Sequence, residues 1–140
     1  MYTQEFADFV LIGHSERRDN FLESNELVTQ KIEKALIDGI MPIVCVSELS
    51  QFEDTSFDRE IIIAYEPISA IGTGNPESPK ETEKFAKELK KRGFQKVLYG
   101  GSVDASNVNN YLHLDSISGV LIGGASLNAS TFSEVLKNAI

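Results

Sequence analysis

Residues 61–74 read IIIAYEPISAIGTG, an unbroken apolar run that passes directly into a turn containing Glu66, Pro67 and two glycines. The run does not alternate between apolar and polar residues, which is typical of a strand buried on both faces of a parallel sheet. Four other runs share this character, at residues 9–12, 41–46, 96–99 and 119–122. Together with residues 61–65 they predict five strands, each followed by a polar or glycine-rich turn where such folds usually carry their chemistry.

Amphipathic stretches separate these runs and predict four helices, over residues 24–38, 79–92, 105–112 and 130–139. In the first, apolar side chains recur at helical spacing and Gly39 follows the end. In the second, Pro79 occupies the first turn, where a proline is tolerated, and Gly93 follows the end. Strands that alternate with helices predict βα units on a parallel sheet, and we interpret residues 1–140 as a single α/β domain.

One connection departs from this alternation of strands and helices. Residues 47–60 place 14 residues between the second and third predicted strands and show no helical apolar period. Parallel strands need a crossover of about a dozen residues or more. The connection is therefore barely long enough, and it is expected to form either one turn of helix or an extended strap.

Composition narrows the class of protein. The chain has 140 residues, 41% of them hydrophobic, which excludes disordered and collagen-like classes. No apolar run approaches the roughly 18 residues of a membrane span, and residues 1–5 show no secretory signal. The single cysteine, Cys45, cannot form an internal disulfide and is expected in the core of a cytoplasmic protein. A net charge of -8 argues against nucleic acid or an anionic membrane as a partner, but not against a small anionic substrate.

Four motifs follow the predicted strands in order: GHSERR at residues 13–18, YEPISAIGTG at 65–74, YGGS at 99–102 and IGGAS at 122–126. Their order and spacing resemble the triosephosphate isomerase family over nearly the whole chain. The resemblance corresponds to the part of that fold from the fourth strand to the eighth. It implies a partial TIM (βα)8 barrel with five parallel strands and about four helices.

Enolisation of a sugar phosphate needs a carboxylate base, an electrophile for the carbonyl oxygen and an anchor for the phosphate. Glu66 stands at the end of a predicted strand beside Pro67, where it is placed for the base. The resemblance implies that Glu66 is the base and that His14 is the electrophile. Read singly, Glu66 would be an exposed loop carboxylate and His14 a hydrogen-bonded loop histidine.

The glycine turns suit an anion, because backbone N–H groups can approach it closely where side chains are absent. The resemblance implies phosphate contacts at Gly72, Ser102, Gly123 and Gly124. It also implies that the loop ending at Gly74 closes over the substrate. The alternative is that these residues form plain tight turns. No His/Cys spacing indicates a metal site, and the family implies no metal or organic cofactor.

The sequence also departs from the family. A full barrel has about 250 residues and eight strands. This sequence has no match for the first three βα units, which carry the family's active-site lysine and asparagine and the loop that docks into the partner subunit. The usual tryptophan of the lid is Ser69, and an aspartate expected before Gly119 is Ser118.

The resemblance therefore implies weak interconversion of dihydroxyacetone phosphate and glyceraldehyde 3-phosphate, a step of glycolysis and gluconeogenesis. Two alternatives stay open. One is a noncatalytic half-barrel that binds phosphate, and the other is an assembly fragment that needs a second copy or a complementary chain. Because five parallel strands cannot close a barrel, two sheet edges stay open and we expect a homo-oligomer.

Overall fold

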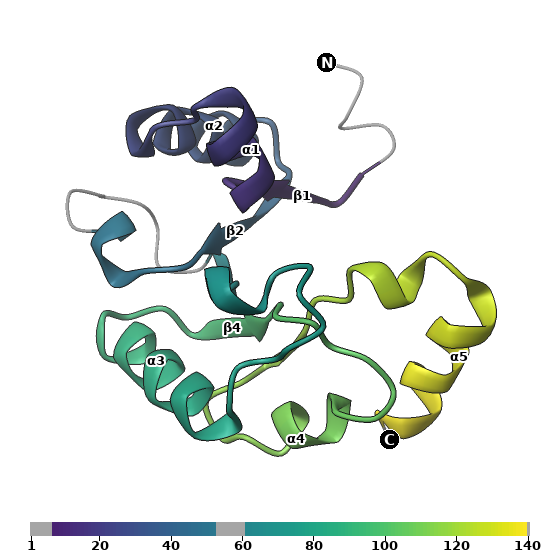
Figure 1. Ribbon diagram of the computed structural model, residues 1–140. Coiled ribbons are helices and arrows are strands. Elements are labelled where there is room, and N and C mark those ends of the chain that lie inside the picture. The colour runs from purple at the N-terminus through teal and green to yellow at the C-terminus, as the bar shows by residue number, and fades with distance from the viewer. Residues whose placement is uncertain (1–6, 53–60, 140) are drawn as a thin grey trace.

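A computed structural model describes residues 7–52 and 61–139 (Figure 1). Residues 1–5, where no secretory signal is expected, lie outside the described residues. So does most of the 47–60 connection. Its described part contains a short 3-10 helix, η1 (Leu49–Phe52), in agreement with the helical-turn form of that connection.

Over the described residues, five strands form one parallel sheet in the order β1-β2-β3-β4-β5, as predicted. The strands are β1 (Phe9–Ile12), β2 (Met41–Val46), β3 (Ile62–Tyr65), β4 (Lys96–Tyr99) and β5 (Gly119–Val120). The carboxyl ends of all five strands lie at the same end of the sheet, because the strands are parallel and in register, with Leu11 opposite Ile43 and Ile43 opposite Ile62. Ligands bind at this end in parallel α/β folds.

Five α-helices are described where about four were expected: α1 (Ser15–Phe21), α2 (Asn25–Ile37), α3 (Pro79–Lys91), α4 (Val108–Leu112) and α5 (Ala129–Asn138). The additional helix is α1. None of its residues is buried, so it has no apolar stripe from which a sequence pattern could predict it. Two further 3-10 helices, η2 (Ile68–Ala70) and η3 (Gly124–Ser126), lie in the turns after β3 and β5.

Two element boundaries differ from the prediction by two residues or more, each for a physical reason. β5 ends at Val120 instead of residue 122, because its pairing partner β4 ends at Tyr99, where a Gly-Gly turn begins. α4 begins at Val108 instead of residue 105. The preceding turn is closed by Asp104, whose carboxylate accepts hydrogen bonds from the backbone N–H (2.8 Å) and hydroxyl (2.6 Å) of Ser106.

The helices form an outer layer on the sheet (Figure 1): α2 packs on β1 and β2, α3 on β4, and α4 on β5. The core lies between the two layers and includes Ile32, Ile63, Leu89, Phe94 and Val97, none of them exposed. Cys45 is buried as predicted. The helices in the described part of the chain lack the length and hydropathy that a membrane span requires.

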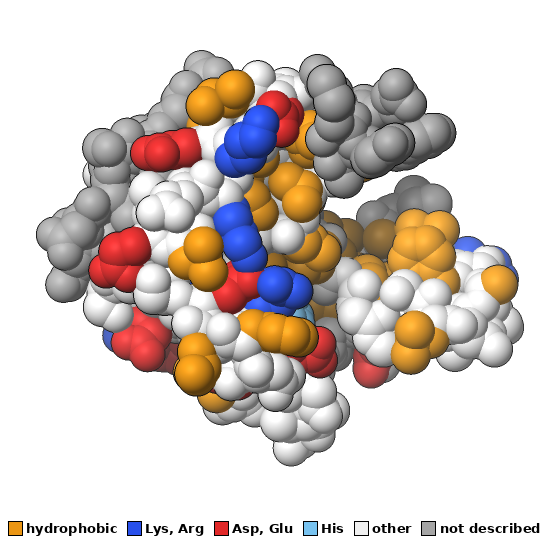
Figure 2. Space-filling view, turned by 90° about the horizontal axis from the view of Figure 1, so that it is seen from above, with side chains coloured by type: hydrophobic (Ala, Val, Ile, Leu, Met, Phe, Trp, Pro, Cys, Tyr) orange, Lys and Arg blue, Asp and Glu red, His pale blue; other side chains and the backbone are white. Residues whose placement is uncertain are grey.

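The two outer strands of the sheet, β1 and β5, each pair with one neighbour. On β1, Phe9 is 55% exposed and Leu11 is 49% exposed. Figure 2 shows hydrophobic side chains gathered around a hollow in the surface. The open edges expected from the sequence are therefore present among the described residues.

Candidate functional site

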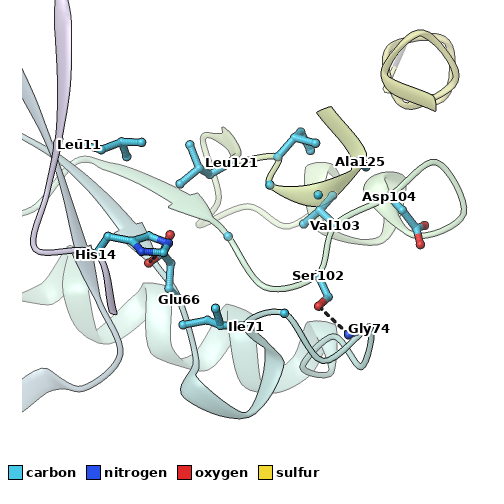
Figure 3. Close-up of a pocket in the computed structure, with 15 residues that line it drawn as sticks. Leu11, His14, Glu66, Ile71, Gly74, Ser102, Val103, Asp104, Leu121 and Ala125 are labelled. Atoms are coloured by element: carbon cyan, nitrogen blue, oxygen red, sulfur yellow. Dashed lines mark hydrogen bonds and ion pairs between the residues drawn. The ribbon is translucent and has the colours of Figure 1, made fainter. Parts of the chain in front are cut away.

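A cavity of about 440 Å³ lies at the carboxyl ends of the strands (Figure 3). All six residues singled out by the sequence line it: His14, Glu66, Gly72, Ser102, Gly123 and Gly124. They come from four separate turns, which follow β1, β3, β4 and β5. The parallel register therefore brings together residues up to 110 positions apart in the sequence.

Glu66 directly follows β3, and its backbone N–H donates a 2.8 Å hydrogen bond to Val46 of β2. Its side chain is only 4% exposed. Room for it depends on Gly100, since a Cβ built there would lie 3.0 Å from Cγ of Glu66 and 3.3 Å from Oε1. Gly100 is thus part of the site through its missing side chain, a role that the motif did not indicate.

The carboxyl of Glu66 is held in a poorly solvated position. Burial raises its pKa, while the electrostatic effect of the neighbouring His14 ring and a hydrogen bond with Cys45 act in the opposite direction. Its Oε2 is buried and has no hydrogen-bond partner among the described residues. His14 lies beside it, with Nε2 3.7 Å from Oε2. A buried carboxylate with an unused lone pair beside a cavity can accept a proton from a bound ligand.

His14 forms the N-cap of α1, and its Nδ1 accepts a hydrogen bond from the backbone N–H of Glu16 at 3.3 Å. Because Nδ1 is the acceptor, a neutral ring carries its proton on Nε2. Nε2 is the ring atom near Glu66, 3.7 Å from its Oε2, and the His14 side chain lies beside Glu66 in the wall of the cavity (Figure 3). The side chain can therefore donate one hydrogen bond to a ligand oxygen.

Ser102 joins the turn after β4 to the loop between β3 and α3, residues 66–78. Its hydroxyl donates to the carbonyl of Ala70 at 2.5 Å and accepts from the N–H of Gly74 at 3.2 Å (Figure 3). Asn107 donates to the carbonyl of Ser102 at 3.0 Å. These bonds hold the middle of the loop beside the cavity, where Ile71, Gly72 and Gly74 line the wall.

The cavity offers backbone donors for an anion. The N–H groups of Gly72, Ser102, Gly123 and Gly124 donate to no other group among the described residues. A Cβ at Gly72, Gly123 or Gly124 would meet nothing within 4 Å, so there is open space on the Cβ side of these glycines. Unpaired N–H groups grouped at a concave turn are the donors that bind phosphate and sulfate.

The charged groups that line the cavity are carboxylates. Glu66 and Asp104 contribute to its wall, whereas no lysine or arginine of the described chain does. The described residues also contain no group of three or more His, Cys, Asp or Glu side chains that could hold a metal ion. Among the described residues that line the cavity, the donors available to an anion are backbone N–H groups and the ring of His14.

The fold and the cavity define an α/β protein of the TIM-barrel class, with a candidate anion site at the carboxyl ends of its strands. The sequence model of the family described as triosephosphate isomerase matches residues 1–139. The chain belongs to the triosephosphate isomerase family.

Three relatives illustrate the match. The chain is 36% identical to the triosephosphate isomerase of Mycoplasmopsis pulmonis (strain UAB CTIP), over 93% of this chain and 60% of that protein. It is 39% identical to that of Dictyostelium discoideum, over 94% of this chain and 63% of the relative. It is also 39% identical to that of Herminiimonas arsenicoxydans, over 96% of this chain and 66% of the relative. The chain thus spans less than two thirds of the length of these relatives.

Proposed function

We propose that this chain binds a small phosphorylated triose and interconverts dihydroxyacetone phosphate and glyceraldehyde 3-phosphate, with weak activity. The observation that carries the proposal is the cavity itself. It combines a buried carboxylate and a histidine donor, Glu66 and His14, with four backbone N–H groups that donate to nothing else among the described residues. These are the three elements that enolisation of a phosphorylated ketose requires.

In this proposal Glu66 removes a proton from the carbon next to the carbonyl, and Nε2–H of His14 donates a hydrogen bond to the carbonyl oxygen. The electron pair of the broken C–H bond forms the C=C bond of an enediolate. Proton transfer between the two oxygens and return of the proton from Glu66 to the neighbouring carbon give the isomer. No proton is gained or lost overall.

Gly72, Ser102, Gly123 and Gly124 are the proposed phosphate contacts. A positioned acid–base group contributes about 10²- to 10⁴-fold to a rate, and one preorganised electrostatic donor about 10²- to 10³-fold. Because no cation lines the cavity in the described chain, we expect a rate well below that of a site containing a lysine.

We also propose that the chain acts as a single cytoplasmic domain that forms a homo-oligomer.

Glu66→Gln tests the catalytic proposal, with protein purified from a host that lacks its own isomerase. We expect the activity to fall about 10²-fold or more, since the amide cannot take up the proton. Glu33→Gln is the matched control, because Glu33 is exposed on α2. Equal traces of activity in the wild type and Glu66→Gln would contradict catalysis.

The absence of a lining cation also favours a second candidate, a noncatalytic phosphate-binding half-barrel. Both candidates require phosphate to stabilise the fold, by about 2.7 kcal/mol at 100 times the dissociation constant. Gly124→Ala is expected to weaken this effect with little change in the free protein, because its Cβ meets no neighbour. The lack of a melting shift at tens of millimolar phosphate would exclude both candidates.

A further inference from the structure

Glu77, near the carboxyl end of the 66–78 loop, is hydrogen-bonded to three tyrosines. Tyr65 Oη donates to Oε1 of Glu77 at 3.1 Å. The backbone N–H of Glu77 donates to Tyr99 Oη at 2.9 Å, and Tyr111 Oη donates to the carbonyl of Glu77 at 2.6 Å. The tyrosines belong to β3, β4 and α4, so one loop residue is tied to three separate elements.

The tyrosine rings are themselves held firmly. Tyr99 stacks on Tyr111 with ring centroids 4.0 Å apart, and Tyr65 stacks on Phe85 at 3.8 Å. Burial raises the pKa of all three tyrosine hydroxyls, so they remain protonated and able to donate. Glu77 is thus bound by hydroxyls whose rings are fixed by stacking, and partners fixed in this way reduce the entropy cost of ordering the loop.

Only part of this arrangement depends on the glutamate side chain. The bonds to Tyr99 and Tyr111 use the backbone of residue 77, which nearly every amino acid would supply. The bond from Tyr65 needs the carboxylate, whose other oxygen accepts a long 3.4 Å contact from Thr82. Since Tyr65 directly precedes Glu66, the carboxylate of Glu77 connects the far end of the loop to the neighbour of the proposed base.

We propose that Glu77 is a positioning residue, whose carboxylate holds the 66–78 loop in the conformation in which Gly72 and Gly74 line the anion cavity. The proposal rests on the function proposed above for that cavity. The middle of the loop is otherwise tied to the rest of the fold through Ser102 among the described residues. Loss of the carboxylate should therefore let the loop leave the cavity while the sheet stays intact.

Amide hydrogen exchange in the free protein is the direct test. The reporter is the N–H of Gly74, which donates to the hydroxyl of Ser102 in the structure and would lose this bond if the loop moved away from the cavity. We expect Glu77→Ala and Tyr65→Phe each to speed its exchange about tenfold, the worth of a hydrogen bond to a charged group. Glu77→Gln keeps an acceptor for Tyr65 and should restore slow exchange. The double variant should exchange no faster than either single one.

Glu88→Ala is the control, since Glu88 is an exposed carboxylate on α3 paired with Lys91. Unchanged exchange at Gly74 in Glu77→Ala would overturn the proposal. So would faster exchange of the β3 and β4 amides in equal measure, because Glu77 would then only stabilise the fold.

Titration with inorganic phosphate separates this inference from the proposed function. We expect Glu77→Ala to weaken phosphate binding about fivefold, because less of the protein has the loop over the cavity. An unchanged affinity in Glu77→Ala would contradict the positioning role. A wild-type protein that binds no phosphate would contradict the proposed function, while the exchange rates of the free protein would still decide the role of Glu77.

Discussion

Burial of Glu66 suits the carboxylate to accept a proton, but the same burial makes its charged form unfavourable in the folded protein. The buried carboxyl has a raised pKa, so the folded chain holds its proton more tightly than the unfolded chain does. As pH rises past the unfolded pKa, the unfolded state loses this proton first. The contribution of Glu66 to stability is therefore greatest in acid and is lost as pH rises through the folded pKa.

This direction of the pH dependence leads to a prediction for the stability of Glu66→Gln. The neutral amide removes the cost of a buried charge, so the variant should be more stable than the wild type at pH 7. The gain should disappear below pH 4, where both proteins carry a neutral side chain. Urea unfolding at the two pH values measures it. A gain that grows toward acid pH would be the opposite result.

Gly101 illustrates a second constraint on a single residue. A Cβ built there would lie 2.4 Å from Oη of Tyr99 and 2.9 Å from Cβ of Ala70, both in the buried interior. We expect Gly101→Ala to destabilise the fold by about 1–3 kcal/mol through overpacking. Thermal unfolding beside Gly124→Ala, which meets no neighbour, measures the cost. Equal stability of the two variants would show that the turn can shift to accommodate the added Cβ without a cost in stability.

At the scale of elements, α1 is held without a hydrophobic face. No residue of α1 is buried. Arg17 of α1 and Lys31 of α2 both donate to Oε1 of Glu23, whose side chain is 2% exposed. Burial alone would raise the pKa of Glu23, but the bonds from Lys31 and Arg17 outweigh it and lower the pKa. This carboxylate joins α1, the helix that His14 caps, to the rest of the fold.

Glu23→Gln should therefore destabilise the protein at pH 7, by about 1–3 kcal/mol. The sign is opposite to that of Glu66, since the folded pKa is lowered. The stabilisation is present above the unfolded pKa, and it is lost as pH falls through the folded pKa. Urea unfolding between pH 7 and pH 3 should show the two proteins converging in acid. A constant difference across that range would show that the charge of Glu23 is unimportant.

At the scale of the whole molecule, the sheet has two open edges and exposed apolar side chains on β1. An edge with unpaired N–H and C=O groups favours pairing with another chain. We predict that the wild type forms a homo-oligomer, and that Phe9→Lys shifts it toward the monomer by placing a charge at the edge. Light scattering measures the mass. A 15.5 kDa monomer that binds no hydrophobic dye would contradict the prediction.

The sheet and the location of the site could be predicted because both depend on short local patterns. The runs at β2 and β3 are apolar throughout, and parallel strands bring the turns that follow them to one edge. The turns that contain Glu66 and His14 could thus be predicted to lie at the same end of the sheet, although the sequence gives no distance between the two side chains.

What the sequence did not predict depends on partners that lie far apart in the chain. The role of Gly100 comes from the position of Glu66, 34 residues earlier. Glu77 meets Tyr111, which lies 34 residues later. The helix α1 is set by its cap and by ion pairs, which leave no apolar period to detect. Such contacts follow from packing, which local propensity does not encode.

The use of His14 as the cap of α1 has an evolutionary consequence. A residue that only begins a helix needs a short side chain with an acceptor, which Ser, Thr, Asp and Asn supply better than histidine does. In descendants that lack the proposed reaction, drift would be expected to exchange His14 for one of those four and leave the helix in place. The identity of this one side chain would then separate lineages selected for catalysis from lineages that retain only the scaffold.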